Sequence, residues 1–418
     1  MMTRCLGVVL VCLLLALAPG CGSGATGESA GVSAAGLERI DAAAREEIEA
    51  GHKAGLALLI ARHGDVVYER AFGEGDIGAD LPLRTDSYFR MFSMTKPIVS
   101  VALLMLYEEG HFQLDDPLAT YAPAMADVMV YAGEDERGRM TLETTRRPIT
   151  IRDVFRHTAG FSYGVSPGES ASDPVATLYR DRGVSYMDMD SVSELVEEKL
   201  PHLPLLFQPG ARWHYSFAHD VQAWLVEHFS GMPIDQFLRE RIFEPLKMDE
   251  SFYGEPQPTD PRRTVVYTHD EQGRLVEAEA LMAMAQRFGT HHFGGAGLTM
   301  TMHDYARFCQ MLLNEGELDG VRILERGTVE LMRSNHLAPG ESIAFFPGFG
   351  YGLGVSVCYG PEASGTLCSE GQFGWGGAAS TWMFIDPEED LIAVICAQHQ
   401  FDATFLRRFE RLIYQSLE

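Results

Sequence analysis

Residues 89 to 98 read FRMFSMTKPI, and in this stretch Ser93 and Lys96 stand three positions apart. Pro97 follows directly, and proline is tolerated in a helix only within the first turn because it has no backbone N–H. The apolar run after it, IVSVALLMLYEEG, therefore predicts a buried helix that begins close to Ser93 and stops at Gly110. Residues three apart share a helix face, so we expect the lysine to stand beside the serine hydroxyl.

The chemistry of this pair depends on its surroundings, because Ser-x-x-Lys alone is common and serine is often only a helix cap. The positive end of the helix dipole and the apolar neighbours both disfavour an ammonium group, so we expect a lowered pKa for Lys96. A neutral amine beside the Ser93 hydroxyl is a general base beside a nucleophile, as in the serine–lysine variants of the catalytic triad.

A second segment, PGARWHYSFAHD, supplies a possible partner for the pair. Tyr215 follows a Pro-Gly turn and precedes a helix that we expect from about Asp220. Its phenol could reach Ser93 and Lys96 and support the proton transfer. A tyrosine of the core is the alternative interpretation.

A third segment, FGWGGAASTWMFIDP, predicts a strand that opens with Trp375, Gly376 and Gly377. Two adjacent glycines allow a substrate to lie close against strand backbone. A β-bulge is the alternative.

The order of elements predicts an α+β fold. A helix from Leu37 and a hairpin around His63-Gly64-Asp65 begin the chain, and strands followed by the helix FLRRFERLIYQSL end it. We expect the two ends to form one antiparallel sheet flanked by helices, with a mainly helical lobe, roughly residues 98–290, inserted between them. A cleft between the lobes is the expected place for a site.

The N-terminus has the features of an export signal. Arg4 precedes an apolar run that ends at Ala18, shorter than the ~20 residues that span a bilayer, so residues 1–20 predict a signal peptide. Small residues before Cys21 resemble a bacterial lipoprotein cleavage site, which predicts lipid attachment at Cys21 in a bacterial envelope, on the periplasmic face of the outer membrane. Plain secretory cleavage, leaving a periplasmic or secreted protein, is the alternative. Residues 21–36 are expected to be a flexible linker, followed by one domain over 37–418.

Charge and composition exclude some partners. The formal net charge is −26 over 418 residues, which repels nucleic-acid phosphates, so no nucleic-acid partner is expected. His291 and His292 are adjacent, so their side chains diverge, and no metal site or cofactor is predicted.

Four cysteines follow Cys21. Cys309 and Cys396 lie in apolar stretches and are expected in the core. Cys358 and Cys368 flank a Gly-rich turn and could pair across a hairpin if the protein is exported. The spacing leaves their pairing open.

The three motifs occur in the order of a known family, and the chain resembles the serine hydrolases of the β-lactamase and penicillin-binding protein type. The resemblance spans roughly residues 37–415 and is greatest for class C β-lactamases and family VIII carboxylesterases. It rests on three motifs in order: Ser93-x-x-Lys96, Tyr215-Ser216-x and Trp375-Gly376-Gly377.

The resemblance implies a role for each residue. Ser93 would be acylated while Lys96 and Tyr215 share the proton. The backbone N–H groups of Ser93 and Ala378 would form the oxyanion hole. His157 has no catalytic role in the family and is expected to be structural.

Two departures bear on the substrate. Phe217 stands where many lactamases and peptidases have an asparagine that binds a substrate amide, and Trp375 replaces a lysine that attracts a carboxylate. With Gly376 and Gly377, these residues are expected to bind substrate. Both changes remove polar recognition, which favours an esterase on a neutral, fairly apolar small-molecule acyl substrate. A DD-peptidase or β-lactamase and a non-catalytic binding or regulatory protein on the same fold are the alternatives.

A competing nucleophile motif is rejected. Residues 164–168, GVSPG, match G-x-S-x-G, whose oxyanion hole uses the N–H of the residue after the serine. Here that residue is Pro167, which has no N–H. Ser166 is therefore not expected to be the nucleophile.

Overall fold

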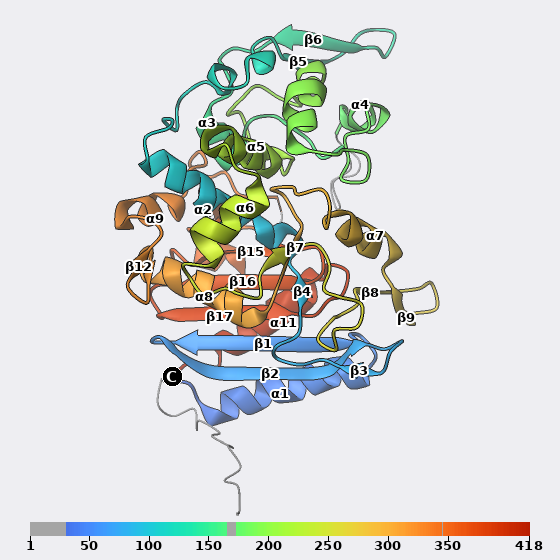
Figure 1. The fold of residues 1–418 in the computed structure, drawn as a ribbon, viewed down its shortest axis with the longest axis vertical. Helices are drawn as coiled ribbons and strands as arrows, with labels where there is room; N and C mark the ends of the chain where they lie inside the picture. Colours follow the sequence, from blue (N-terminus) through green and yellow to red (C-terminus); the bar gives the residue numbers. More distant parts are fainter. Residues whose placement is uncertain (1–30, 165–172, 345) are drawn as a thin grey trace, which may run out of the picture.

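The computed structural model describes residues 31–164, 173–344 and 346–418, and an antiparallel sheet dominates it (Figure 1). The strand order is β13-β14-β15-β16-β17-β1-β2-β3, so strands from both ends of the chain meet where β17 pairs with β1. This confirms the predicted α+β fold. The strands are β1 (Gly55–Arg62), β2 (Asp65–Asp76), β3 (Leu81–Pro82), β13 (Phe349–Tyr351), β14 (Ser356–Cys358), β15 (Phe373–Gly377), β16 (Thr381–Asp386) and β17 (Leu391–Cys396).

The first hairpin forms where its sequence predicts it. Arg62 pairs with Asp65 across a turn in which His63 and Gly64 both have positive φ, at 53° and 80°. Such a turn matches the right-handed twist of the two strands. Successive residues of β1 alternate between two apolar cores, with Leu58 on one face and Leu59 on the other.

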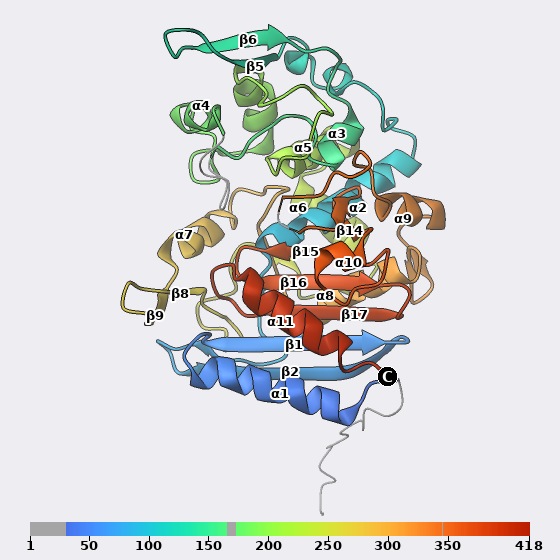
Figure 2. The same cartoon turned by 180° about the vertical axis from the view of Figure 1, so that it is seen from behind.

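Helices cover both faces of the sheet. Helices α1 (Ala34–Glu49) and α11 (Ala403–Tyr414) pack together on one face, with α11 in front in Figure 2. Helix α8 (Met302–Leu313) packs on the other face, against β16, β17 and β1. The sheet is therefore buried on both sides, which explains why its central strands are almost wholly apolar.

Helix α1 begins earlier than expected and shortens the predicted linker. The expected linker reached residue 36, but the helix starts at Ala34, and the Ser33 hydroxyl accepts a hydrogen bond from the Gly36 N–H at 3.0 Å. Val32 is buried and forms a β-bridge with Leu417, which ties the helix start to the end of the chain. The predicted signal peptide and Cys21 lie outside the described residues.

The second lobe lies at the top of Figure 1, above the sheet. Besides its helices it carries the hairpin of β5 (Met129–Glu134) and β6 (Met140–Thr144). Within the range 98–290 expected for this lobe, Tyr267 forms a β-bridge with His399, next to the end of β17. The helices of this region are α2 (Thr95–Glu108), α3 (Ile151–Phe155), α4 (Ala176–Asp181), α5 (Ala218–Ser230), α6 (Ile234–Leu238) and α7 (Glu279–Arg287).

The remaining elements are short. A three-stranded sheet has the order β4-β10-β7 and borders the site. The short strands and helices are β4 (Phe89–Arg90), β7 (Phe252–Tyr253), β8 (Tyr267–His269), β9 (Leu275–Glu277), β10 (Leu298–Met300), β11 (Glu317–Leu318), β12 (Val321–Arg322), α9 (Arg326–Met332) and α10 (Pro361–Ser364).

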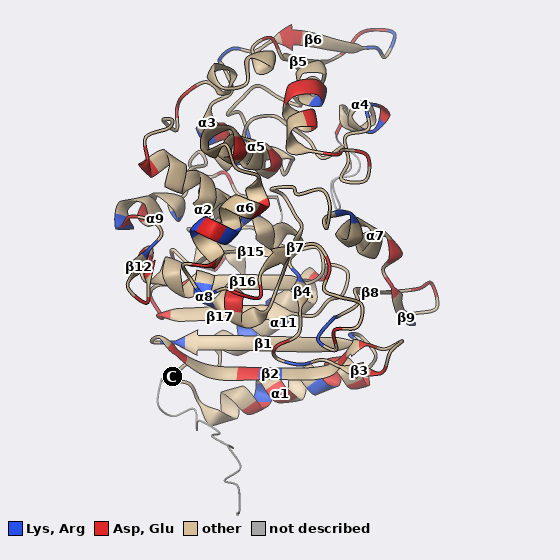
Figure 3. Cartoon of the chain, viewed as in Figure 1, with Lys and Arg blue, Asp and Glu red and all other residues tan. Residues whose placement is uncertain are grey.

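Charged residues of both signs are interspersed along the two lobes (Figure 3). Of the helices in the described ranges, none has the length and hydropathy to cross a bilayer.

Candidate active site

Ser93 lies in a single 3-10 turn, Phe92–Met94, that leads directly into α2. Phe92 has φ of 45°, a left-handed conformation that is strained for a bulky residue. Thr95 holds the far side of this turn, because its hydroxyl accepts a hydrogen bond from the Leu298 N–H at 3.2 Å. The tertiary structure thus fixes the nucleophile candidate at the N-terminal end of a buried helix.

Lys96 is buried, with 1% of its surface exposed, and its amine lies against the serine. Its Nζ is 3.1 Å from Ser93 Oγ and donates a hydrogen bond to the Gly295 carbonyl at 2.6 Å. Burial lowers the pKa of Lys96 to about 7, although the charge of Asp220 acts in the opposite direction. A large fraction of the lysine is therefore neutral near neutral pH and able to accept the serine proton.

Tyr215 lies in the loop just before α5, on the other side of the same amine. The Lys96 Nζ is 4.7 Å from the centre of the Tyr215 ring. Burial raises the pKa of Tyr215, while a hydrogen bond with the Ser93 side chain acts to lower it. Burial therefore favours the protonated phenol, and the roles of Lys96 as base and of Tyr215 as proton carrier remain predictions.

Strand β15 borders this group through its glycines. A Cβ on Gly377 would lie 2.2 Å from the Met91 carbonyl oxygen, so only glycine allows this close approach to the chain before Ser93. Ala378 is the next residue, in the turn that ends β15. Ser93 lies in the first turn of its helix, where backbone N–H groups have no intrahelical partner. Ser93 and Ala378 therefore both lie at the site, and the oxyanion-hole role of their backbone N–H groups remains a prediction.

Phe217 and Trp375 are both buried at the site, against aromatic rings. The Phe217 ring is 4.4 Å from Tyr163 and 5.2 Å from Tyr186, measured between centroids. The centroid of the Trp375 ring is 5.6 Å from that of Tyr215. Phe217 and Trp375 thus pack against Tyr163 and Tyr215, the two rings beside the Lys96 amine, and direct contact with substrate remains a prediction for both.

Asp220 is a member of the site that sequence reasoning missed. It is fully buried in α5, where its Oδ1 accepts the Gly295 N–H at 2.9 Å and its Oδ2 accepts the Tyr186 hydroxyl at 3.0 Å. The carbonyl of the same Gly295 accepts the Lys96 hydrogen bond, so Asp220 holds the peptide that orients the lysine. Burial raises the pKa of Asp220 to about 6, while the charge of Lys96 lowers it. The available signal was an acid in the first turn of a helix whose first nine residues are all buried.

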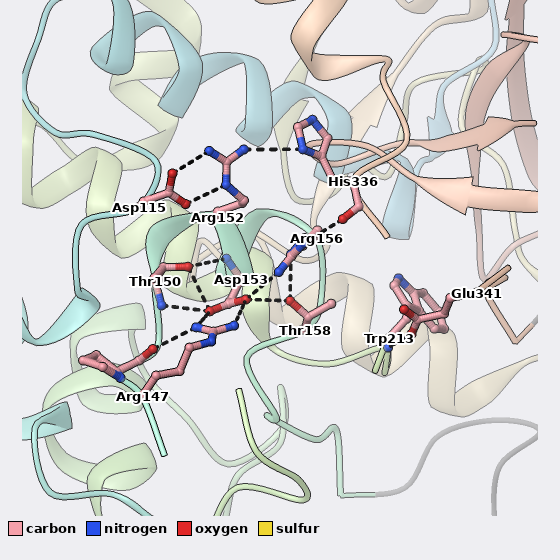
Figure 4. A network of polar contacts seen from close by, with 11 residues as sticks. Asp115, Arg147, Thr150, Arg152, Asp153, Arg156, Thr158, Trp213, His336 and Glu341 are labelled. Carbon is pink, nitrogen blue, oxygen red and sulfur yellow. Dashed lines mark hydrogen bonds and ion pairs between the residues drawn. The ribbon is translucent and has the colours of Figure 1, made fainter. Parts of the chain in front are cut away.

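A network of ion pairs and hydrogen bonds surrounds Asp153 in α3 (Figure 4). Burial would raise the pKa of Asp153, but hydrogen bonds led by that from Arg147 lower it to about 2. Arg156 binds the Asp153 carboxylate at 3.0 Å and the His336 carbonyl at 2.6 Å, joining α3 to the segment before β13. His157 follows, and its Nδ1 lies 3.1 Å from Ser216 Oγ, beside Tyr215. This contact agrees with the structural role expected for His157.

The adjacent histidines do face different directions. His291 Nε2 lies 3.3 Å from Asp190, and His292 Nδ1 lies 3.1 Å from Asp235. Across the ranges that the structure describes, no group of three or more potential ligands is placed to hold a metal ion.

Replacing Asp220 by asparagine is expected to change the pH profile and the rate of ester cleavage. The negative charge of Asp220 raises the pKa of Lys96, so its loss should shift the acidic limb of kcat/KM to lower pH. Loss of the charged hydrogen bonds should also lower kcat about 10-fold. Asp181→Asn, the same change at an exposed position of α4, serves as the control. An acidic limb that stays in place would contradict this assignment.

A serine hydroxyl, a buried lysine amine and a buried tyrosine that meet at one point are the arrangement of a serine hydrolase. The comparison with known families agrees. The sequence model described as Beta-lactamase matches residues 40–415, and the chain belongs to that family.

Individual proteins similar to this chain include an esterase and a hydrolase. The chain is 32% identical to an uncharacterized protein of Mycobacterium tuberculosis over 380 residues, 87% of this chain and 90% of the relative. It is 28% identical to Esterase EstB of Burkholderia gladioli over 365 residues, 83% of this chain and 86% of the relative. Among solved structures it is similar to EstCE1, described as a hydrolase with promiscuous acyltransferase activity, with a TM-score of 0.74, 25% identity and coverage of 91% and 98%.

Proposed function

We propose that this serine hydrolase is an esterase that cleaves neutral, fairly apolar small-molecule esters through an acyl-Ser93 intermediate. The observation that carries the proposal is the group of buried aromatic rings beside the Lys96 amine, where Phe217 packs on Tyr163 and Trp375 packs near Tyr215. Phe217 and Trp375 occupy the motif positions at which lactamases and peptidases of this type place an amide and an ammonium group. The similarity to Esterase EstB supports ester cleavage.

The proposed reaction follows from the geometry. Lys96 takes the Ser93 proton as the oxygen attacks the ester carbonyl. Tyr215 then gives its phenol proton to the departing alcohol and receives the proton held by Lys96, so both groups regain their starting states. The N–H groups of Ser93 and Ala378 stabilise the oxyanion. Water then attacks the acyl-enzyme, with the same lysine as base.

A comparison of two substrates tests the proposal. We expect kcat/KM for p-nitrophenyl butyrate to exceed that for a chromogenic cephalosporin by at least about 10²-fold, because the site lacks the family's carboxylate-binding lysine. A cephalosporin or a D-Ala-D-Ala peptide as the better substrate would make the protein a β-lactamase or DD-peptidase instead. No turnover together with no labelling of Ser93 by a fluorophosphonate would make it a non-catalytic binding protein.

Acyl transfer is a second candidate function, supported by the acyltransferase activity named for EstCE1. Apolar aromatic walls favour an alcohol over water as the acceptor of the acyl group. Adding a small primary alcohol to the p-nitrophenyl butyrate reaction measures this directly. Formation of the new butyrate ester in excess of free butyrate would identify a transferase.

We also propose that the chain is exported and carries a lipid at Cys21. The support is the sequence pattern of residues 1–21 alone. Mass spectrometry of the mature N-terminus tests it: a diacylglyceryl adduct on Cys21 is expected, and an unmodified N-terminus at another residue would contradict it.

A further inference from the structure

Two cysteines outside the active site face each other at the edge of the large sheet. Cys358 ends β14, and Cys368 lies ten positions later, before the turn into β15. Their Sγ atoms are 2.8 Å apart, and the two side chains are only 1% and 4% exposed. A movement of under about 1 Å would bring the sulfurs to the bonding distance of a disulfide.

The backbone around the pair is already fixed in register. The Cys358 N–H donates to the Gln372 carbonyl at 2.8 Å, and the Gly371 N–H donates back to the Cys358 carbonyl at 2.8 Å. These two hydrogen bonds hold the chain before β15 against the end of β14. The sulfurs are therefore brought together by ladder hydrogen bonds of the fold, and a bond between them would need no rearrangement of the sheet.

The surroundings of Cys368 favour its thiolate. The hydrogen bond from the Cys358 thiol is the largest cause of a pKa of Cys368 lowered to about 6. Ser364 adds a hydroxyl, with its Oγ 3.7 Å from the Cys368 Sγ. The other two cysteines of the described region differ, because burial raises the pKa of both Cys309 and Cys396. Among the cysteines in the described ranges, the Cys358–Cys368 pair is thus the one that combines close sulfurs with a lowered thiol pKa.

We propose that Cys358 and Cys368 are a dithiol site that closes to an intrachain disulfide when the protein meets an oxidising compartment. The oxidant is a small-molecule disulfide of the glutathione class. The Cys368 thiolate attacks one of its sulfurs and releases one thiolate, leaving a mixed disulfide on Cys368. Cys358 gives its proton to solvent, attacks the Cys368 sulfur and releases the second thiolate. Two electrons pass from the protein to the oxidant, and one S–S bond forms.

The bond would link the end of β14 to the segment that precedes β15. It would close the loop that contains α10 and restrain this edge of the sheet. Strand β15 carries Trp375 at its centre and Gly377 at its end, so the cross-link would also stabilise the strand that borders Ser93. The inference does not depend on the substrate, since neither thiol takes part in acylation.

Peptide mapping tests the proposal directly, because Glu362 lies between the two cysteines. The purified full chain is treated with oxidised glutathione, both folded and during refolding, then denatured in iodoacetamide and cut after glutamate. Cleavage gives peptide 342–362 with Cys358 and peptide 363–370 with Cys368. We expect a single linked species, lighter than the two peptides together by two hydrogen atoms. Separate, alkylated peptides after both treatments would overturn the proposal.

Thermal unfolding supplies an independent readout. Because a disulfide restricts the unfolded chain, dithiothreitol should lower the Tm of the oxidised protein by on the order of 3–6 °C. Cys358→Ser should lose this dependence on reductant, while Cys309→Ala, a control at another buried cysteine, should keep it. If dithiothreitol lowered the Tm of Cys358→Ser as much as that of the parent chain, the shift would come from another thiol. That result would contradict the proposed Cys358–Cys368 disulfide.

Discussion

Ser93→Ala is expected to lower kcat/KM for p-nitrophenyl butyrate by at least about 10⁴-fold, because it removes the alcohol oxygen that lies 3.1 Å from the Lys96 amine. Labelling by a fluorophosphonate should disappear at the same time. The change removes one oxygen from a partly buried side chain, so circular dichroism and the Tm should stay close to those of the parent. Activity and labelling therefore report on chemistry and not on folding.

Ser166→Ala is the matched control for this result. Ser166 belongs to the competing GVSPG motif and lies outside the described residues, and its exclusion rests on Pro167. The Ser166→Ala variant should keep most of the activity and the label. If Ser166→Ala were inactive and Ser93→Ala active, the nucleophile would be Ser166 of the GVSPG motif. That result would overturn the assignment of the site.

Lys96→Met is expected to lower kcat about 10³-fold, within the range usual for loss of a general base. Methionine retains the length and apolar character of the buried lysine stem, so the core should stay packed. The reaction of Ser93 with a fluorophosphonate should slow by a similar factor, because the same proton must leave. Lys247→Met, at an exposed lysine, controls for the substitution itself.

The pH profile separates a base from a merely structural lysine. Lys96 must be neutral to accept a proton, and burial lowers its pKa to about 7. In the parent enzyme, kcat/KM should therefore rise with pH up to about 7 and level off above it. The residual activity of Lys96→Met should lack this limb. A limb of unchanged position and shape would show that another group titrates.

Local sequence correctly predicted secondary structure wherever a short segment determines its own backbone conformation. Pro97 placed the start of α2 next to Ser93, and the His63-Gly64 pair specified the turn between β1 and β2, because both features act through backbone angles of adjacent residues. The expected ends of some elements differ by a few residues from those in the structure, because contacts with distant parts of the chain determine them. The start of α1, for example, depends on Val32 meeting Leu417.

Other properties of the site depend on residues far apart in the chain. Asp220 acts on Lys96 through Gly295, a contact across 75 positions of sequence that no local pattern predicts. Phe217 and Trp375 were identified as departures from a family pattern, but only the packing shows that their rings are enclosed by other aromatics.

The sequence by itself determined the fold class and the set Ser93, Lys96 and Tyr215, because spacing, proline and motif order are properties of the chain. The tertiary structure decided the protonation states of these groups. Desolvation of Lys96, the opposing charge of Asp220 and the burial of Tyr215 arise only when separate elements enclose the same few atoms. It also brought the sulfurs of Cys358 and Cys368 within reach of each other, since the pairing of β14 with the chain before β15 sets that distance.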